Sequence, residues 1–239
     1  MNPRGNLWYR FIRWLARNVG FRSLGGIRSI GEENIPMTGP LIVAPNHMSY
    51  LDPPIIACSQ RREVTFMAKE ELFDVFFLGW LIRSLGAFPL KRGAGDRDAI
   101  RKAIDLLKSG RALLVFPEGT RGNGVTLGKI TPGVSTLAKN TGAMVLPVGI
   151  CGTQIVWPKG GKIRRRQRMT VVFGKPFCYT DIAVGENERE NRSLIQLKIE
   201  SELLALCKQA GLELRTSPSS SDSKTSDPTE TGSGSQDPE

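Results

Sequence analysis

Short apolar runs alternate along most of the chain with segments in which apolar residues recur at helical spacing. The runs are rich in Val, Leu and Ile, and they predict buried strands at 41–44, 64–67, 112–116, 144–150 and 169–173. Helical spacing predicts helices at 96–108, 133–140 and 188–210. This alternation indicates an α/β fold in which helices cover a mostly parallel central sheet. In such a sheet, the loops that follow the strands carry the active residues.

Two segments in the first third of the chain carry large apolar faces. Residues 7–21 predict an amphipathic helix with aromatic side chains on one face, while Arg10, Arg13 and Arg17 gather on the opposite side. Such a helix suits the plane of a membrane interface, although it could equally pack on its own domain. Residues 70–85 predict a second helix that is apolar nearly all round. Together the two segments favour attachment to a membrane surface.

The remaining patterns divide the chain into three expected parts. No stretch reaches the roughly 18 to 20 apolar residues that a spanning helix requires, and the basic N-terminus lacks a signal-peptide cleavage site. Residues 216–239 contain almost nothing apolar, so they cannot bury enough surface to fold. We therefore expect an interfacial helix at 1–24, one α/β domain at 25–215 and a disordered acidic tail at 216–239.

The charge of the chain narrows the choice of partners. The formal net charge is +10, from 33 Lys and Arg against 23 Asp and Glu, and the acidic tail makes the rest more basic still. Such a body attracts anionic lipid headgroups, phosphorylated substrates or nucleic acid. We do not expect nucleic acid, because no aromatic stacking platform or recognised motif accompanies the charge. A basic segment at 159–168 favours anionic lipid or an acidic carrier protein, or is only a solvated loop.

Cysteine and histidine usage argues against a metal site. The four cysteines are scattered and the chain has a single histidine, whereas zinc needs clustered Cys and His ligands. We expect neither a metal nor another cofactor. The cysteines also lack the spacing of a disulfide framework, which favours a reducing compartment. The expected location is therefore the cytoplasmic face of a membrane, with the protein attached at the interface.

The single histidine, His47, directly follows a predicted buried strand, in the sequence Asn-His-Met-Ser-Tyr-Leu-Asp that ends at Asp52. Pro53 and Pro54 come next, and because proline suits the first turn of a helix, Asp52 falls where a helix cap would be. In a non-helical turn the aspartate could accept a hydrogen bond from one imidazole nitrogen, which leaves the other free to take a proton from a hydroxyl. We therefore expect a general-base pair, although Asp52 could be only a cap.

Cationic residues lie at three further predicted strand ends. The segment FPEGTR ends one strand, and its Arg121 offers a planar fork of donors suited to phosphate oxygens. Lys91 and Arg92 follow another strand, and Lys69 follows a third. Because the carboxyl ends of parallel strands meet at one edge of a sheet, we expect these cations to share a cleft with His47.

Four motifs together resemble those of the 1-acylglycerol-3-phosphate acyltransferases and their glycerolipid relatives. They are NHxxxxD at 46–52, Lys91-Arg92-Gly93, FPEGTR at 116–121 and VLPVG at 145–149. Their order and spacing agree with that family over about residues 25–180. The combination is specific, whereas an isolated HxxxxD would be a weak signal.

The resemblance implies acyl transfer in which His47 is the general base and Asp52 orients it. The acceptor hydroxyl would attack an acyl thioester on coenzyme A or acyl carrier protein directly, without an acyl-enzyme. The residues that it implies in substrate binding are mostly cations and loop residues: Lys69, Lys91, Arg92, Glu118, Gly119, Thr120 and Arg121, with Pro147 in the acyl-binding region.

The leading hypothesis for the reaction is acylation of the sn-2 hydroxyl of 1-acyl-sn-glycerol 3-phosphate (lysophosphatidic acid), which gives phosphatidic acid in phospholipid biosynthesis. The expected partners are the acyl donor, lysophosphatidic acid and an anionic membrane surface. The acceptor could instead be glycerol 3-phosphate or another lysolipid. The chain could also be a non-catalytic membrane-binding module, but retention of both His47 and Asp52 favours an enzyme.

Overall fold

The computed structural model of the protein describes residues 7–74, 76–90, 97–164 and 166–216, without the side chains of residues 69, 76–78, 90 and 97. The predictions for Lys91, Arg92 and the acidic tail beyond residue 216 lie outside this part of the chain.

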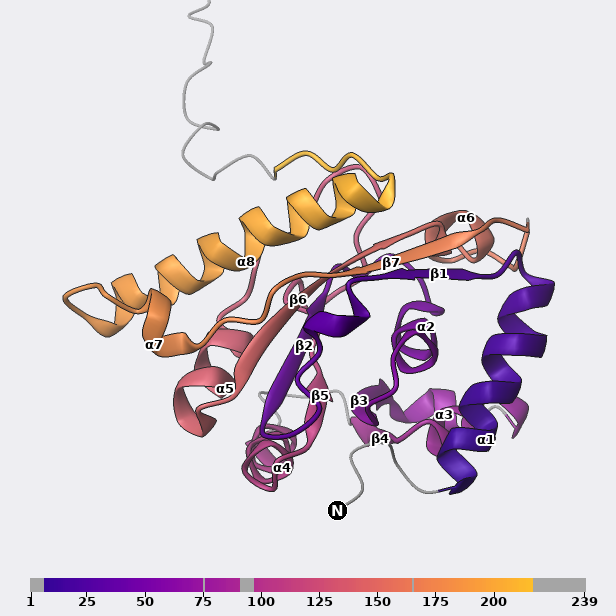
Figure 1. The fold of residues 1–239 in the computed structure, drawn as a ribbon, viewed down its shortest axis with the longest axis horizontal. Coiled ribbons are helices and arrows are strands. Elements are labelled where there is room, and N and C mark those ends of the chain that lie inside the picture. Colours follow the sequence, from indigo (N-terminus) through magenta and orange to yellow (C-terminus); the bar gives the residue numbers. More distant parts are fainter. Residues whose placement is uncertain (1–6, 75, 91–96, 165, 217–239) are drawn as a thin grey trace, which may run out of the picture.

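Seven strands in the described residues form one sheet, in the order β1-β7-β6-β2-β5-β3-β4 (Figure 1). They are β1 (Ile27–Ile30), β2 (Leu41–Pro45), β3 (Val64–Lys69), β4 (Ala87–Leu90), β5 (Ala112–Leu114), β6 (Met144–Cys151) and β7 (Met169–Phe173). Neighbouring strands pair in parallel except β6 and β7, which are antiparallel. The prediction of a mostly parallel sheet is confirmed.

Helices cover both faces of this sheet (Figure 1). They are α1 (Leu7–Leu15), α2 (Asp52–Ser59), α3 (Phe76–Ser84), α4 (Arg97–Lys108), α5 (Gly133–Thr141), α6 (Thr153–Val156), α7 (Tyr179–Ile182) and α8 (Glu188–Ala210), with the short helical segments η1 (Ala16–Phe21), η2 (Glu32–Asn34) and η3 (Glu70–Phe73). Helices α1, α2 and α3 pack on one face, and α4, α5 and α8 pack on the other.

The central strands are buried on both faces, which explains their continuous apolar runs. In β2, Leu41 and Val43 join the core cluster beneath α1 to α3, whereas Ile42 and Ala44 join the cluster beneath α4, α5 and α8. All four side chains are fully buried. Each fully buried Leu, Ile or Val contributes about 1.5–3 kcal/mol relative to an exposed one. The strand that leads to His47 is therefore held firmly on both sides.

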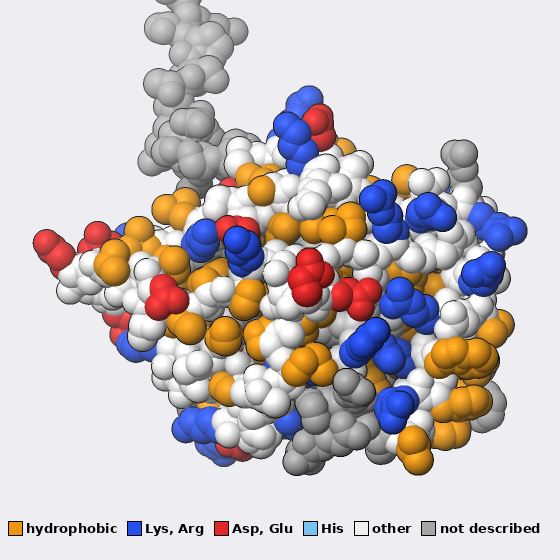
Figure 2. Space-filling model, in the orientation of Figure 1, with side chains coloured by type: hydrophobic (Ala, Val, Ile, Leu, Met, Phe, Trp, Pro, Cys, Tyr) orange, Lys and Arg blue, Asp and Glu red, His pale blue; other side chains and the backbone are white. Residues whose placement is uncertain are grey.

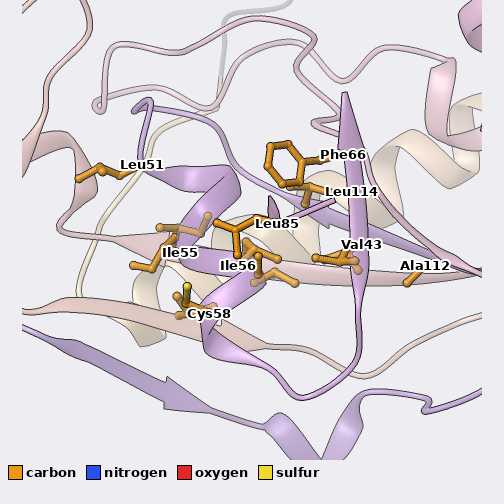
Figure 3. Packing of buried hydrophobic residues seen from close by; sticks show 14 of the residues in the cluster. Val43, Leu51, Ile55, Ile56, Cys58, Phe66, Leu85, Ala112 and Leu114 are labelled. Atoms are coloured by element: carbon orange, nitrogen blue, oxygen red, sulfur yellow. The ribbon is translucent and has the colours of Figure 1, made fainter. Parts of the chain in front are cut away.

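Helix α2 lies inside the first core cluster. All of its residues except Pro53 are buried. Figure 3 shows Ile55, Ile56 and Cys58 of this helix packing over the sheet. Because the helix is enclosed, its first residue, Asp52, cannot shift without disturbing the core.

Two arginines of the segment formed by α1 and η1 contact the body of the protein. The guanidinium of Arg17 donates to the carbonyl of Cys58 at 2.9 Å, and that of Arg13 donates to the carbonyl of Gln60. These bonds satisfy carbonyls at the C-terminal end of α2, which have no partner within that helix. Trp8 and Trp14, on the aromatic face, are about half exposed, with exposed fractions of 51% and 57%. Arg13 and Arg17 thus face the body while Arg10 is exposed, and the two tryptophans face outward.

Residues 70–85 do not form the single helix that was predicted. They divide into η3 and α3, which fold against each other at Gly79, where a Cβ would lie 2.3 Å from the carbonyl oxygen of Phe73. None of the helices in the described residues combines the length and apolarity that crossing a bilayer demands.

The end of α8 leads the chain back across the molecule to the loop that follows Arg121. Arg215 donates its N–H to the carbonyl of Val125, and Leu127 donates its N–H to the carbonyl of Arg215, each at 2.9 Å. This short parallel pairing fastens residues 125–127 to the body of the protein.

Candidate active site

Two loops form the site because the strands that precede them are neighbours. β2 and β5 pair in parallel, with Val43 opposite Leu114, so both strands end at the same edge of the sheet. The loop after β2 carries His47 and the loop after β5 carries Arg121. Further along the same edge, β3 ends at Lys69, whose side chain is not described. Lys91 and Arg92 follow β4 and lie outside the described residues.

Asn46 fixes the point at which the chain leaves β2. Its side-chain oxygen accepts the N–H of Ile150 at 2.7 Å, and its amide nitrogen donates to the carbonyl of Ile150 at 3.1 Å. These bonds continue the pairing of β2 with β6 beyond Pro45, where proline has no N–H to offer. The side chain is fully buried. Asn46 therefore aims the loop that begins with His47.

His47 and Asp52 are in hydrogen-bond contact, with Nδ1 of the ring 2.8 Å from Oδ2 of the carboxylate. The same oxygen accepts the N–H of Met48 at 2.6 Å and of Ser49 at 2.7 Å. Asp52 is fully buried, whereas the His47 side chain keeps an exposed fraction of 17%. Because Nδ1 donates to the carboxylate, Nε2 is the nitrogen left to accept a proton.

The alternative role of Asp52, as a helix cap, does not fit these contacts. Leu51 occupies the cap position of α2, and Asp52 is the first residue of the helix. Its carboxylate accepts the N–H groups of residues 48 and 49, which precede it, rather than those of the first turn of α2. Three donors thus meet one oxygen of the Asp52 carboxylate. The aspartate is thus positioned to orient the imidazole and to stabilise a positive charge on it.

The loop after β5 holds His47 from the other side. The Phe116 ring stacks on the imidazole, with centroids 3.7 Å apart and planes 20° apart. The N–H of His47 donates to Glu118 Oε1 at 2.7 Å, and its carbonyl accepts the N–H of Gly122 at 2.8 Å. The ring and the backbone of His47 are therefore both fixed by residues that follow β5.

Both carboxylate oxygens of Glu118, which the resemblance implies in substrate binding, accept backbone N–H groups of the protein. Oε1 accepts the N–H of His47, and Oε2 accepts the N–H of Gly128 at 2.8 Å. The side chain is buried, with an exposed fraction of 8%. Burial raises the pKa of this carboxyl above its ordinary value, against the opposing effect of the two N–H donors. Glu118 ties the two ends of the 118–128 loop to His47.

Arg121 lies against an aromatic ring of the His47 loop. Its Cζ is 3.7 Å from the ring centroid of Tyr50, and the Tyr50 ring is 5.3 Å from that of Trp157. The carbonyl of Arg121 accepts a hydrogen bond from Nζ of Lys159 at 2.8 Å. Nη1 of Arg121 is buried and has no hydrogen-bond partner among the described residues. A charged donor is therefore available next to the imidazole loop.

The remaining residues implied by the resemblance differ in their surroundings. Gly119 has a φ of 69°, a left-handed conformation that glycine adopts without strain, and a Cβ there would meet Thr131 only at 3.6 Å. The turn itself, rather than close approach of another group, thus requires glycine. Thr120 is exposed. Pro147 is buried in β6, opposite Ala44 of β2, so it lies within the sheet.

Sequence reasoning missed three residues at the site. Ser49 donates its hydroxyl to the carbonyl of Trp157 at 2.7 Å, and Trp157 in turn lies beside Tyr50. Tyr50 is inside the NHxxxxD motif, and an aromatic residue at this position was the one available signal. Trp157 is 108 residues away from Ser49 in the sequence, so only the fold brings it to the site.

The basic segment 159–168 is connected to this site rather than separate from it. The Lys159 side chain donates to the carbonyl of Arg121, and Arg164 donates its N–H to the carbonyl of Val156, beside Trp157.

No group of three His, Cys, Asp or Glu side chains in the described residues is arranged to hold a metal ion. The chemistry available is that of an oriented imidazole in a loop whose Tyr50 ring carries the Arg121 guanidinium. Such a pair can accept a proton from a hydroxyl while an anion is bound beside it.

Comparison with known proteins agrees with this kind of site. A family model described as acyltransferase matches residues 26–151, and the chain belongs to the acyltransferase family. The chain is similar to the chloroplastic 1-acyl-sn-glycerol-3-phosphate acyltransferase of Arabidopsis thaliana, with 30% identity over 195 residues that cover 80% of this chain and 54% of that protein.

Two further similarities concern a different acceptor and the fold. A lyso-ornithine lipid O-acyltransferase of Pseudomonas aeruginosa is 34% identical over 112 residues, which cover 46% of this chain and 43% of that protein. The crystal structure of the 1-acyl-sn-glycerophosphate acyltransferase from Thermotoga maritima matches with a TM-score of 0.68 and 30% identity, covering 81% of this chain and 77% of that one. The chain thus spans about half the length of the two curated relatives named here.

Proposed function

We propose that the protein transfers an acyl chain from a thioester to the sn-2 hydroxyl of 1-acyl-sn-glycerol 3-phosphate, which yields phosphatidic acid. The observation that carries this proposal is the contact between His47 and the buried Asp52, next to a guanidinium that has a free donor. Similarity to the Arabidopsis and Thermotoga proteins, both named as acyltransferases of 1-acyl-sn-glycerol phosphate, supports this choice of acceptor. Either acyl-CoA or acyl carrier protein can supply the thioester.

Each residue of the site has a defined part in the proposed reaction. Nε2 of His47 takes the proton of the acceptor hydroxyl as its oxygen attacks the thioester carbonyl, while Asp52 stabilises the imidazolium. The C–O bond forms, the C–S bond breaks, and the departing thiolate takes the proton from the imidazolium. Arg121 holds the phosphate of the acceptor. General-base assistance of this kind accelerates a reaction about a hundredfold to ten-thousandfold.

The test is release of free thiol from acyl-CoA and from acyl carrier protein by the purified protein in detergent. We expect release only when lysophosphatidic acid is present, and we expect His47→Ala to lower it by at least about a hundredfold. Thermal unfolding of the variant shows whether it has kept its fold. Near-normal turnover in a folded His47→Ala protein would refute the assignment.

The acceptor can be resolved in the same assay. Because one relative is named as a lyso-ornithine lipid acyltransferase, lyso-ornithine lipid and glycerol 3-phosphate should be compared with lysophosphatidic acid. A free guanidinium favours the acceptors that carry phosphate. Faster transfer to lyso-ornithine lipid than to lysophosphatidic acid would replace the proposed acceptor.

We also propose that the protein works on an anionic membrane surface, to which it attaches peripherally at the cytoplasmic face. Apolar side chains gather over α1, and basic side chains lie on the surface next to them (Figure 2). Trp8 of α1 meets Trp80 of α3 edge to face, with centroids 6.2 Å apart, so the two helices share one aromatic surface. Half-exposed tryptophans beside cations suit the boundary between headgroups and acyl chains.

A further inference from the structure

Arg121 is held by groups that leave its charge unneutralised. The Cζ of its guanidinium lies over the Tyr50 ring, 3.7 Å from the centroid, and its backbone carbonyl accepts a hydrogen bond from the Lys159 side chain. A carboxylate partner would occupy the in-plane N–H groups and cancel the charge, whereas a ring contacts only the face of the guanidinium. The side of Arg121 that binds an anion thus stays available.

The buried Nη1 of Arg121 has no hydrogen-bond partner among the described residues. A buried donor that lacks a partner costs about 1–3 kcal/mol, and more when it is charged. After a turn of the guanidinium that uncovers this atom, an oxygen of a bound phosphate would satisfy it with a charge-assisted hydrogen bond. The ring and the unused donor are two independent observations that indicate the same thing, a guanidinium prepared for an anion.

Tyr50 is itself fixed from behind. The Trp157 ring lies 5.3 Å away at 49°, its Nε1 donates to the carbonyl of Gly161 at 2.8 Å, and its backbone carbonyl accepts the hydroxyl of Ser49. Tyr50 and Ser49 are neighbours in the loop that joins His47 to Asp52. The direction of the guanidinium is therefore set by the same loop that sets the imidazole.

We propose that Tyr50 is a positioning residue for the acceptor phosphate: its ring orients the Arg121 guanidinium, and thereby sets the distance between the bound phosphate and His47. The inference rests on the proposed function and adds to it the residue that determines how tightly a phosphorylated acceptor is held. Trp157 supports the ring, so the aromatic pair forms one wall of the phosphate site.

The first test compares Tyr50→Leu with Tyr50→Phe in the transfer assay. Cation–π contacts are worth about 0.5–2 kcal/mol, so Tyr50→Leu should raise the KM for lysophosphatidic acid about 2- to 30-fold, with kcat and the donor KM nearly unchanged. Tyr50→Phe keeps the ring face and should restore the KM to within about twofold. A Tyr50→Leu protein that loses kcat instead would show that the residue only supports the His47 loop, which overturns the proposal.

A double-mutant cycle isolates the contact with Arg121. Arg121→Ala should raise the acceptor KM alone, and adding Tyr50→Leu to it should cause no further rise, because the ring acts through the guanidinium. Independent, multiplying effects in the double variant would contradict the proposed route.

A binding measurement keeps the inference separate from the reaction itself. Glycerol 3-phosphate should raise the unfolding temperature of the native protein and of Tyr50→Phe. Its midpoint concentration, at which half of the sites are occupied, should be higher for Tyr50→Leu. If no acyl transfer is detected but this ranking holds, the proposed function fails and the phosphate site stands. If transfer occurs and the midpoints of all three proteins agree, the proposed role of Tyr50 fails.

Discussion

The position of His47 depends on bonds to its backbone as much as on the bond to its ring. Asp52 holds the imidazole, while Glu118 and Gly122 hold the N–H and the carbonyl of the same residue. The pairing of His47 with Asp52 could be predicted, because the flanking prolines indicate a non-helical turn. The role of Glu118 could not, because the sequence does not distinguish a carboxylate that meets backbone N–H groups from one that meets substrate.

Replacing Glu118 by Gln should destabilise the protein, because an amide presents one acceptor where two N–H groups need one each. We expect a loss of about 1–3 kcal/mol at pH 7 in the free energy of unfolding, measured in urea. Glu33→Gln, an exposed glutamate in η2, is the matched control and should change little.

The raised pKa of Glu118 adds a pH dependence to this comparison. Burial favours the protonated carboxyl in the folded state, so between its ordinary value and the raised one the folded protein binds more protons than the unfolded chain. The stability of the native protein relative to Glu118→Gln should therefore increase as the pH falls from 7 toward 4.5. A difference that stays constant would mean that folding does not shift the pKa of Glu118, and one that shrinks would mean that folding lowers it.

At the scale of elements, apolar patterns predicted several of the strands and helices that line the core. The strand at 169–173 and the helix at 188–210 coincide with β7 and α8. β1 was missed, because Ile27–Ile30 is short, half-buried and contains Arg28, so its place is decided by pairing with β7 at the edge of the sheet. The sequence also could not predict which way Arg13 and Arg17 point, because their direction depends on carbonyls at the end of α2, more than 40 residues away.

The contact between α1 and α2 gives a test at this scale. Arg17→Met keeps much of the side-chain volume but removes the donor that reaches Cys58, so we expect a loss of about 1–2 kcal/mol in the free energy of unfolding. Arg10 is an exposed arginine of α1, the helix that precedes η1, and Arg10→Met should cost less than about 0.5 kcal/mol. Equal losses in urea unfolding would show that the Arg17 bond does not anchor α1.

Across the whole molecule, exposed apolar side chains are distributed unevenly. The sequence indicated an apolar face at 7–21, but it could not show where that face lies relative to the site. The exposed face of α1 includes Phe11 and Trp14, and the aromatic contact of Trp8 with Trp80 extends this surface to α3. Large exposed apolar patches are uncommon on proteins that stay in water. The acidic tail and the boundaries of the expected parts stay predictions.

Vesicle binding tests whether this surface meets lipid. Trp14→Asp should lower partitioning onto vesicles that contain anionic lipid by about tenfold or more, because it puts a charge where an indole would be buried. Leu197 is similarly exposed, at 61%, but lies on α8 across the sheet, so Leu197→Asp should leave partitioning within about twofold. Partitioning of the native protein should also fall as salt increases. Equal losses in the two variants would argue against a lipid-facing side.

The pairing of Arg215 with residues 125–127 has a consequence for the order in which the molecule is completed during translation. The two strands that flank β2, and with it the imidazole loop, are β5 and β6, and both leave the ribosome before α8 and residue 215 are made. The loop behind Arg121, in contrast, gains its last backbone partners only when residue 215 emerges. The backbone that follows Arg121 is thus fastened only near the end of synthesis, after all the described strands of the sheet have been made.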